Sequence, residues 1–319
     1  MVGAQLAIFF SYFLIFAVAL MIVAIGGMFS ERSGIINIGL EGTMVFGGFF
    51  GLLTLTGLTE AGLHPALIVI ITILVAVISG AAYSLLLATV AIHLNADQTL
   101  IGTAMNLLAT AAVVVLARRI SPYATDAITF VKDAFIIQIG QFDINIFLFL
   151  GIIILIVSWF ALFRTRFGLR LRACGENPQS AASAGINVFK MRYIGVIISG
   201  ALAGLGALAY IIPTTSNWNA SSGVAGFGFL ALAVLIFGAW KPFRIAGAAL
   251  FFSFFLALST CFMELFDALF GIQLGRNVGV TQELFQMIPY IISLVLLAFT
   301  SRKSRAPKAE GQPYERGQR

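Results

Sequence analysis

Long apolar stretches separated by short polar ones dominate this chain of 319 residues. A helix that crosses a bilayer needs about 20 predominantly apolar residues. Helices are expected in such stretches because backbone groups in lipid must find hydrogen-bond partners within their own segment. The qualifying stretches are 4–29, 35–58, 65–92, 99–117, 145–163, 193–212, 224–240, 245–262 and 284–300. The pattern predicts an all-α, polytopic membrane helical bundle of about nine spans, within a range of roughly eight to ten.

Composition supports this fold class and excludes a separate soluble domain. The chain is 60% hydrophobic and 10% charged, with a mean hydropathy of +1.01, whereas soluble domains contain about 25% charged residues. The first apolar stretch has no basic region before it and is about twice as long as the core of a signal peptide, so we interpret it as a span. Two cysteines, Cys174 and Cys261, do not form a disulfide framework.

Basic residues set the orientation. Residues 164–192 hold six Lys and Arg against Glu176, and residues 301–319 hold six more. Together with 241–244, these segments are predicted to be cytoplasmic by the positive-inside rule. The expected domains are a transmembrane domain, 1–300, containing a cytoplasmic loop at 164–192, and a disordered basic cytoplasmic tail at 301–319 that can touch anionic membrane lipid. The outward loops are then 118–143, 213–223 and 263–283, with Met1 outside.

The cytoplasmic loop contains the stretch "GENPQSAASAG", residues 175–185. Asn177 can cap a helix that Pro178 begins, and Gly185 is a natural C-terminal stop. The small residues between them predict a short helix over which a groove of another protein could close. A docking helix for a cytoplasmic partner and an ordinary capped loop both fit this pattern.

A second polar region, residues 31–51, interrupts the apolar pattern near the start of the chain. Asn37 and Glu41 are four residues apart and would share one helix face. A carboxylate inside a membrane usually faces the bundle interior or a water path, and the glycines here favour a broken helix of the kind that lines transport sites. The alternatives are that Glu41 caps a broken helix or pairs with Arg32.

A polar stripe follows one face of the fourth predicted helix, with spacings of 4, 3 and 4 residues. Its members are Thr99, Thr103, Asn106 and Thr110. They could line a polar conduit. Alternatively, the threonine hydroxyls bond back to their own helix and Asn106 holds two helices together. In the outward loop 213–223, Trp218 is interpreted as an interfacial anchor.

Motifs for catalysis and for cofactor or metal binding are missing from the sequence. No G-x-x-x-x-G-K-[ST] motif occurs, so the chain does not cradle ATP itself. His64 and His93 are not spaced as metal ligands, and no nucleophile with a base and an orienting group stands out. We expect a protein that is not an enzyme by itself, without a cofactor or metal, and without nucleic acid as a partner.

Three stretches in order resemble one protein family. They are "SGIINIGLEGTMVFGGFFG", "GENPQSAASAGINVFKMRYIGVIISGALAGLGALAY" and "GFGFLALAVLIFGAWKP". All three are similar to the permease subunits of bacterial ABC importers, in the family shared by branched-chain amino acid, ribose-type sugar and nucleoside systems. The similarity covers residues 1–300, and "ERSGIINIGLEG" is most similar to the nucleoside-uptake branch.

The resemblance implies a multi-pass permease of the bacterial cell membrane that forms a path for a small polar solute, such as a nucleoside. It implies partners: an ABC ATPase that uses ATP, a second related permease in a heterodimer, and an extracytoplasmic solute-binding lipoprotein. The ATPase-coupling positions of the family match Gly175, Glu176, Asn177, Pro178, Ala181, Ala182 and Gly185. The path would involve Asn37, Glu41, Thr99, Thr103 and Asn106. The alternatives are a sugar or amino-acid ABC permease, a secondary transporter using Glu41, or a membrane scaffold.

Overall fold

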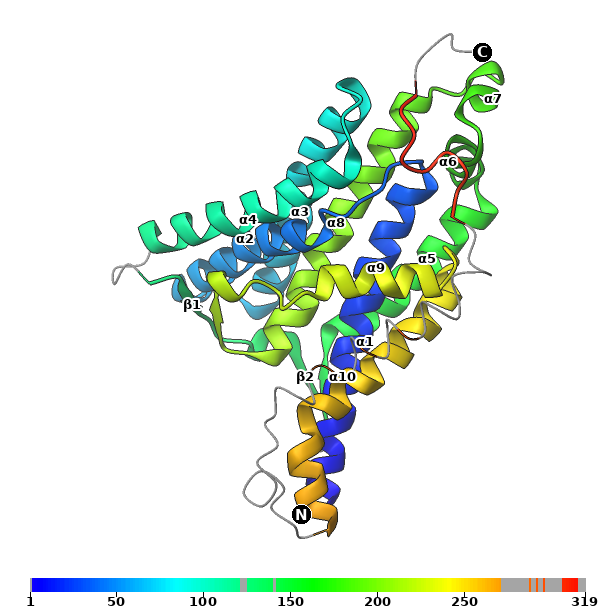
Figure 1. The fold of residues 1–319 in the computed structure, drawn as a ribbon. Coiled ribbons are helices and arrows are strands. Elements are labelled where there is room, and N and C mark those ends of the chain that lie inside the picture. The colour runs from blue at the N-terminus through cyan, green and yellow to red at the C-terminus, as the bar shows by residue number, and fades with distance from the viewer. Residues whose placement is uncertain are drawn as a thin grey trace.

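The structure, a computed structural model, describes residues 2–120, 125–139, 142–270, 287, 291, 295 and 306–314. Long helices make up most of it (Figure 1). The helices are α1 (Val2–Arg32), α2 (Leu40–Glu60), α3 (Pro65–His93), α4 (Gln98–Ile120), α5 (Ile146–Arg164), α6 (Arg166–Glu176), α7 (Pro178–Ser183), α8 (Val188–Thr214), α9 (Phe227–Phe237) and α10 (Pro242–Phe270). Short elements join them: β1 (Ala127–Thr129), η1 (Asp133–Phe135), β2 (Ile136–Ile139), β3 (Phe142–Asn145), β4 (Asn217–Asn219) and η2 (Ala220–Ser222).

Within the described residues, eight segments are long and apolar enough to cross a membrane, which confirms the all-α polytopic bundle. They coincide with the first eight predicted spans. The ninth, 284–300, lies outside the described residues apart from isolated positions. The second span begins later than predicted, at Leu40, because residues 35–39 are not helical.

The seventh span differs most from its prediction. Its α-helix, α9, has only 11 residues, or about 16 Å at 1.5 Å per residue, which is roughly half the apolar thickness of a bilayer. Gly226 precedes α9 in the left-handed region with φ 78°, and Trp240 follows it with φ 54°. The chain therefore enters and leaves this helix through sharp turns, and α9 fills only part of the predicted span.

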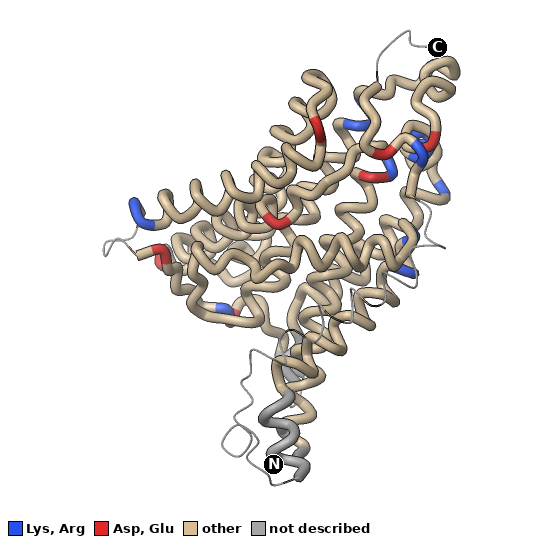
Figure 2. Tube along the Cα trace, in the orientation of Figure 1, with Lys and Arg blue, Asp and Glu red and all other residues tan. Residues whose placement is uncertain are grey.

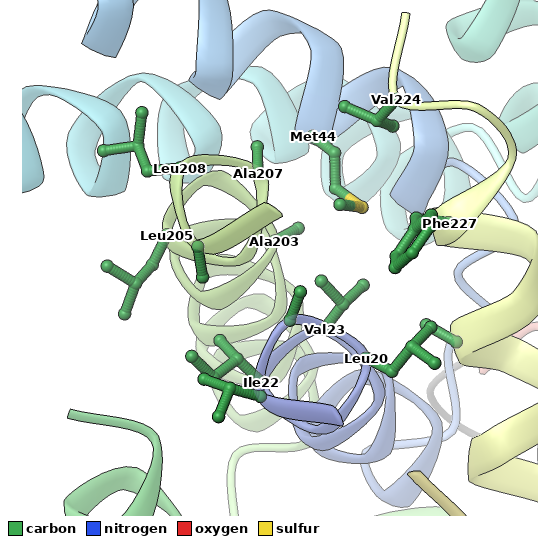
Figure 3. Close-up of a cluster of buried hydrophobic side chains, with 14 of the residues drawn as sticks. Leu20, Ile22, Val23, Met44, Ala203, Leu205, Ala207, Leu208, Val224 and Phe227 are labelled. Carbon is green, nitrogen blue, oxygen red and sulfur yellow. The ribbon is translucent and has the colours of Figure 1, made fainter. Parts of the chain in front are cut away.

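The core lies between α1 and α8, with α2 and α9 packed around them (Figure 3). Leu20 and Val23 of α1 meet Ala203 and Ala207 of α8 in this cluster, together with Phe227 of α9. Close helix approach in a membrane relies on small residues. Glycines supply the room at the crossing of α2 with α8, where a Cβ on Gly47 would lie 2.6 Å from the Cα of Gly204.

Loops predicted to lie outward share one end of the bundle. Strand β1 pairs antiparallel with β4, with Ile128 opposite Trp218, so loops 118–143 and 213–223 lie together. Strands β2 and β3 form a hairpin. Trp218 is not an interfacial anchor: it is buried, and its Nε1 donates to the carbonyl of Gly223 at 2.7 Å. Burial in its own loop satisfies both the ring and its N–H, so no lipid interface is needed.

Segments predicted to be cytoplasmic meet at the opposite end, around the last turn of α1. The Arg32 guanidinium donates to the carbonyl of Trp240 at 3.1 Å and lies 3.7 Å from the Glu176 carboxylate. Figure 2 shows most Lys and Arg residues toward the ends of the helices, with the body of the bundle nearly free of charge. Figure 1 places α6 and α7 beside the last described C-terminal residues and far from the N-terminus.

Part of the C-terminal tail packs against the helices. Residues 306–314, the C-terminal strap, lie against α6 and the turn after α1, with the Ala309 N–H donating to the Gly175 carbonyl at 2.9 Å. Ala309 and Tyr314 are buried. Tyr314 joins a cluster with Cys174, Ala181 and Val188, whereas the sequence predicted a disordered tail over 301–319. Residues 301–305 and 315–319 lie outside the described residues.

Candidate functional site

Glu41 lies in the first turn of α2 and joins that helix to α9. Its Oε1 accepts a hydrogen bond from the Gly226 N–H at 2.9 Å, and its Oε2 accepts one from the Gly228 N–H at 2.6 Å. Both donors belong to the start of α9, where unpaired N–H groups and the helix dipole favour a negative group. Of the alternatives for Glu41, capping a broken helix describes these contacts, and pairing with Arg32 does not.

Close backbone approach makes this cap possible. A Cβ on Gly228 would lie 2.5 Å from the Glu41 Cα and 2.9 Å from its Oε2. A side chain at position 228 would therefore push α9 away from α2. The stretch "GFGFL", which begins the third of the stretches that resemble the family, thus contains the glycine that allows the contact.

Asn106 of α4 holds the non-helical start of α2. Its side-chain oxygen accepts from the Gly42 N–H at 2.8 Å, and its Nδ2 donates to the Ile38 carbonyl at 3.0 Å. One amide therefore satisfies a donor and an acceptor that the broken helix would otherwise leave unpaired. Asn106 therefore joins α4 to the start of α2, which matches the alternative in which it holds two helices together.

Asn37 does not share a helix face with Glu41, which corrects the sequence interpretation. The segment 35–39 is not helical, so the four-residue spacing has no helical meaning there. Asn37 is 1% exposed, and its Nδ2 donates to the Ser199 Oγ of α8 at 2.9 Å. Its Oδ1 has no hydrogen-bond partner among the described residues. Asn37 therefore connects the turn to α8, whereas Glu41 connects α2 to α9.

Threonines of the α4 stripe bond back to their own helix. The Thr103 hydroxyl donates to the carbonyls of Thr99 and Leu100, and the Thr110 hydroxyl donates to the Asn106 carbonyl. Thr99 and Thr103 are exposed, on a face that also exposes Leu100 and Leu107. Thr99 and Thr103 thus lie on the outside of this single chain, whereas Asn106 and Thr110 are partly buried and the Asn106 side chain bonds to the start of α2.

Helices α6 and α7 form the predicted docking region. The Thr165 hydroxyl accepts from the Gly168 N–H at the start of α6, and the Asn177 side chain accepts from the Ser180 N–H at 3.0 Å at the start of α7. Pro178 is the first residue of α7, and Gly185 follows the helix with φ 79°. The capped short helix that Asn177, Pro178 and Gly185 predict is therefore present.

Two faces of α7 differ. Ala181 is buried and Ala182 is partly buried, both against a cluster that contains Cys174, Val188 and Tyr314. The exposed residues are Gln179, Ser180, Ser183 and Ala184. Ala181 and Ala182 therefore pack within this chain, and a partner that covers α7 would meet the other face.

Gly175 and Glu176 anchor this region to α1. A Cβ on Gly175 would lie 2.9 Å from the carbonyl carbon of Arg32, so only glycine allows this approach. The Arg32–Glu176 ion pair lies beside it, and the Trp240 Nε1 donates to the Glu31 carboxylate at 2.6 Å. From the sequence alone, Glu31 and Arg32 resemble charged residues of a loop. No local pattern predicts that Trp240 and Glu176 are their partners.

Comparison with known proteins identifies the family. Residues 9–297 match the family described as the permease component of the branched-chain amino acid transport system. The chain belongs to this permease family. It is 38% identical to the guanosine ABC transporter permease protein NupQ of Bacillus subtilis over 96% of both chains. It is 36% identical to the nucleoside ABC transporter permease protein NupC of Lactococcus lactis over 94% of both.

A shorter match extends the comparison to a different permease of the same organism. Over 34% of this chain and 30% of its own length, the nucleoside ABC transporter permease protein NupB of Lactococcus lactis is 34% identical. The permease described here is thus a multi-pass protein of the bacterial plasma membrane and an importer subunit rather than an enzyme. Within the described residues there is no group of His, Cys, Asp and Glu that could hold a metal ion.

The Glu310 carboxyl of the strap lies among charged groups at the end of α1. The Glu310 carboxyl shares a hydrogen bond with that of Glu31. Burial raises the pKa of Glu310 to about 7, although this hydrogen bond and the charge of Arg32 act in the opposite direction. Burial also raises the pKa of the Cys174 thiol, to about 11, so this thiol stays protonated at neutral pH. The region therefore holds a carboxyl that titrates near neutrality.

Proposed function

We propose that this permease forms half of the translocation path of an ATP-driven importer for nucleosides. The observation that carries the proposal is the identity of 38% and 36% with a guanosine and a nucleoside permease, over nearly the full length of each chain. Because the similarity extends over nearly the whole chain, it includes the residues that line the translocation path as well as those that pack the helices. We therefore infer the substrate class from these nucleoside permeases rather than from the broader family.

The proposed path involves the polar residues at the start of α2. Asn37, Glu41 and Asn106 are the deep polar side chains there, and each already bonds to the protein. A solute would compete for hydrogen bonds of about 0.5–1.5 kcal/mol each, which suits a subunit that must release its cargo. The exposed Thr99 and Thr103 would face the path only when a second permease covers α4.

The proposed ATPase contact is the exposed face of α7. Gln179, Ser183 and Ala184 form this face, while Gly175 and Glu176 fix the loop to the end of α1. The partners are then a cytoplasmic ATPase that uses ATP, a second permease in a heterodimer, and an external binding lipoprotein. The two differently named nucleoside permeases of one Lactococcus strain support the heterodimer.

A secondary transporter using Glu41 is disfavoured by the same geometry. Both oxygens of the carboxylate accept backbone N–H groups, so releasing a proton or ion there would disturb the start of α9.

The test is purification of the tagged permease from its own cells, followed by uptake of labelled guanosine, ribose and leucine in vesicles. We expect an ATPase and a second permease to co-purify, with ATP-dependent uptake of guanosine only. ATP-dependent uptake of leucine or ribose alone would contradict the substrate class, and ATP-independent uptake would contradict the mechanism.

A further inference from the structure

The C-terminal strap forms hydrogen bonds with two parts of the chain that are far apart in the sequence. The Ala309 N–H donates to the carbonyl of Gly175 at the end of α6, at 2.9 Å. The Gly311 N–H donates to the carbonyl of Gly34 in the turn after α1, at 3.1 Å. Three residues of the strap thus connect the loop beside α7 to the segment that leads into α2.

Side chains of the strap pack where α7 packs. Tyr314 is 7% exposed and belongs to the cluster of Cys174, Ala181 and Val188. Its ring centre lies 5.3 Å from that of Phe189 in an edge-to-face arrangement. Ala181 is the buried residue of α7, so movement of α7 changes the surface on which Tyr314 rests.

Gly311 approaches the turn closely at the other contact. Its φ of 75° is a conformation that other residues rarely adopt. A Cβ there would lie 2.8 Å from the Ile36 Cδ1. A side chain at position 311 would therefore separate the strap from the turn while leaving the coupling loop untouched.

Buried polar atoms of Arg192, beneath the strap, and of Glu310, in the strap, lack hydrogen-bond partners among the described residues. Arg192 is 1% exposed, and its Nε and Nη2 have no hydrogen-bond partner within the described part of the chain. The same holds for the Glu310 Oε2. Burying polar atoms without hydrogen bonds costs free energy. The packed position of the strap is therefore less stable than the burial of its apolar side chains alone would make it. An element that must change position during a cycle needs such a small difference between its arrangements.

We propose that residues 306–314 are a coupling element, which passes displacement of α7 to the turn at 34–39 and so to α2. This inference rests on the proposed function, because it requires an ATPase that acts on α7. The proposal adds the strap, as a positioning element, to the loop around α7 that is proposed to contact the ATPase. Its residues act through the turn and touch no substrate.

The test uses the full complex with its ATPase, second permease and binding protein, reconstituted in vesicles. The variants are Gly311→Val, Tyr314→Ala and a chain truncated after Arg305. The matched control is Gly62→Val, because Gly62 also has a positive φ, 67°, but nothing lies within 4 Å of its Cβ position. The measured quantity is labelled guanosine transported per ATP hydrolysed.

We expect the strap variants to assemble with the ATPase and to hydrolyse ATP within about twofold of the wild type. Guanosine per ATP should fall by roughly 5–30-fold, the factor for one or two kcal/mol in a two-state equilibrium, and Gly62→Val should keep the wild-type ratio. An unchanged ratio in the truncated chain would overturn the proposal. Loss of assembly in all three variants would also overturn it, since the strap would then serve folding. A wild-type complex that transports no nucleoside would instead refute the proposed function.

Discussion

The contact between Glu41 and the start of α9 gives the most direct test of the intramembrane site. Each oxygen of the carboxylate accepts one backbone N–H, from Gly226 and Gly228. Hydrogen bonds to a charged group contribute about 1.5–3 kcal/mol each. Glu41→Leu removes both acceptors, so the docked position of α9 should lose about 3–6 kcal/mol. That corresponds to a factor of roughly 10²–10⁴ in the docking equilibrium.

Glu41→Gln should have a smaller effect. The amide keeps one acceptor oxygen, but its NH₂ group meets the second backbone N–H, so about half of the stabilisation is lost. The expected order of guanosine uptake is therefore wild type, then Gln, then Leu. The control is Glu60→Leu, which makes the same change at an exposed position at the other end of α2.

Two measurements separate transport from folding: uptake of labelled guanosine per assembled complex, and the midpoint of thermal unfolding of the purified permease in detergent. Glu41→Leu should lower both guanosine uptake and the unfolding midpoint, whereas Glu60→Leu should change neither. If Gln and Leu at position 41 both transport and unfold like the wild type, the cap has no energetic role and the reasoning fails.

Three further predictions follow from the structure. Asn106→Leu leaves the Gly42 N–H without a partner, at a cost of about 1–3 kcal/mol, so uptake should fall, whereas Thr89→Val, on the exposed face of α3 and outside the proposed path, should keep wild-type uptake. Ala184→Arg adds bulk on the exposed face of α7 without disturbing its buried side, so the ATPase should no longer co-purify, whereas it should remain with Ala184→Ser. The raised pKa of Glu310 means that the docked strap binds a proton more tightly than the released strap. Docking should therefore be strongest below the ordinary value of 4.5 and weaken as pH rises through about 7. Proteolysis of the C-terminus at several pH values measures this, and Glu310→Gln should weaken the dependence without abolishing it, because the Glu31 carboxyl that shares the hydrogen bond remains.

Each of these predictions has an outcome that contradicts it. Equal uptake in Asn106→Leu and Thr89→Val would mean that the amide at position 106 is dispensable. Retention of the ATPase by Ala184→Arg would place its contact elsewhere than on α7. A wild-type strap whose protease sensitivity is the same at about pH 5 and about pH 8 would show that Glu310 does not control docking.

Local chemistry explains what the sequence predicted well. The start and end of α7 follow from Asn177, Pro178 and Gly185, whose effects act within a few residues. The first eight spans follow from apolar length, which the bilayer requires of any sequence. The stop before α2 follows in part from glycines that weaken a helix.

Long-range contacts explain what the sequence did not predict. Glu41 and Gly226 are separated by 185 residues, and no local pattern pairs them. The direction of Ala182 was unpredictable because a helix of six residues has too few turns to show a period. The tail 301–319 was predicted to be disordered because it holds six Lys and Arg, and no local pattern shows that Ala309 and Tyr314 bury against the chain.

The segment from Gly34 to Glu41 connects the two ends of this arrangement. At Gly34 the strap bonds to its backbone, and at Glu41 its last side chain holds α9. Between these points Asn37 is fixed to α8 and the Ile38 carbonyl to α4. These anchors belong to four different elements, so the segment cannot shift without changing at least one of these bonds. Seven residue steps separate Gly34, which the strap contacts, from Glu41, whose side chain holds the start of α9. If the proposed coupling holds, a displacement of the strap would therefore reach α9 through this short length of backbone and the Glu41 carboxylate.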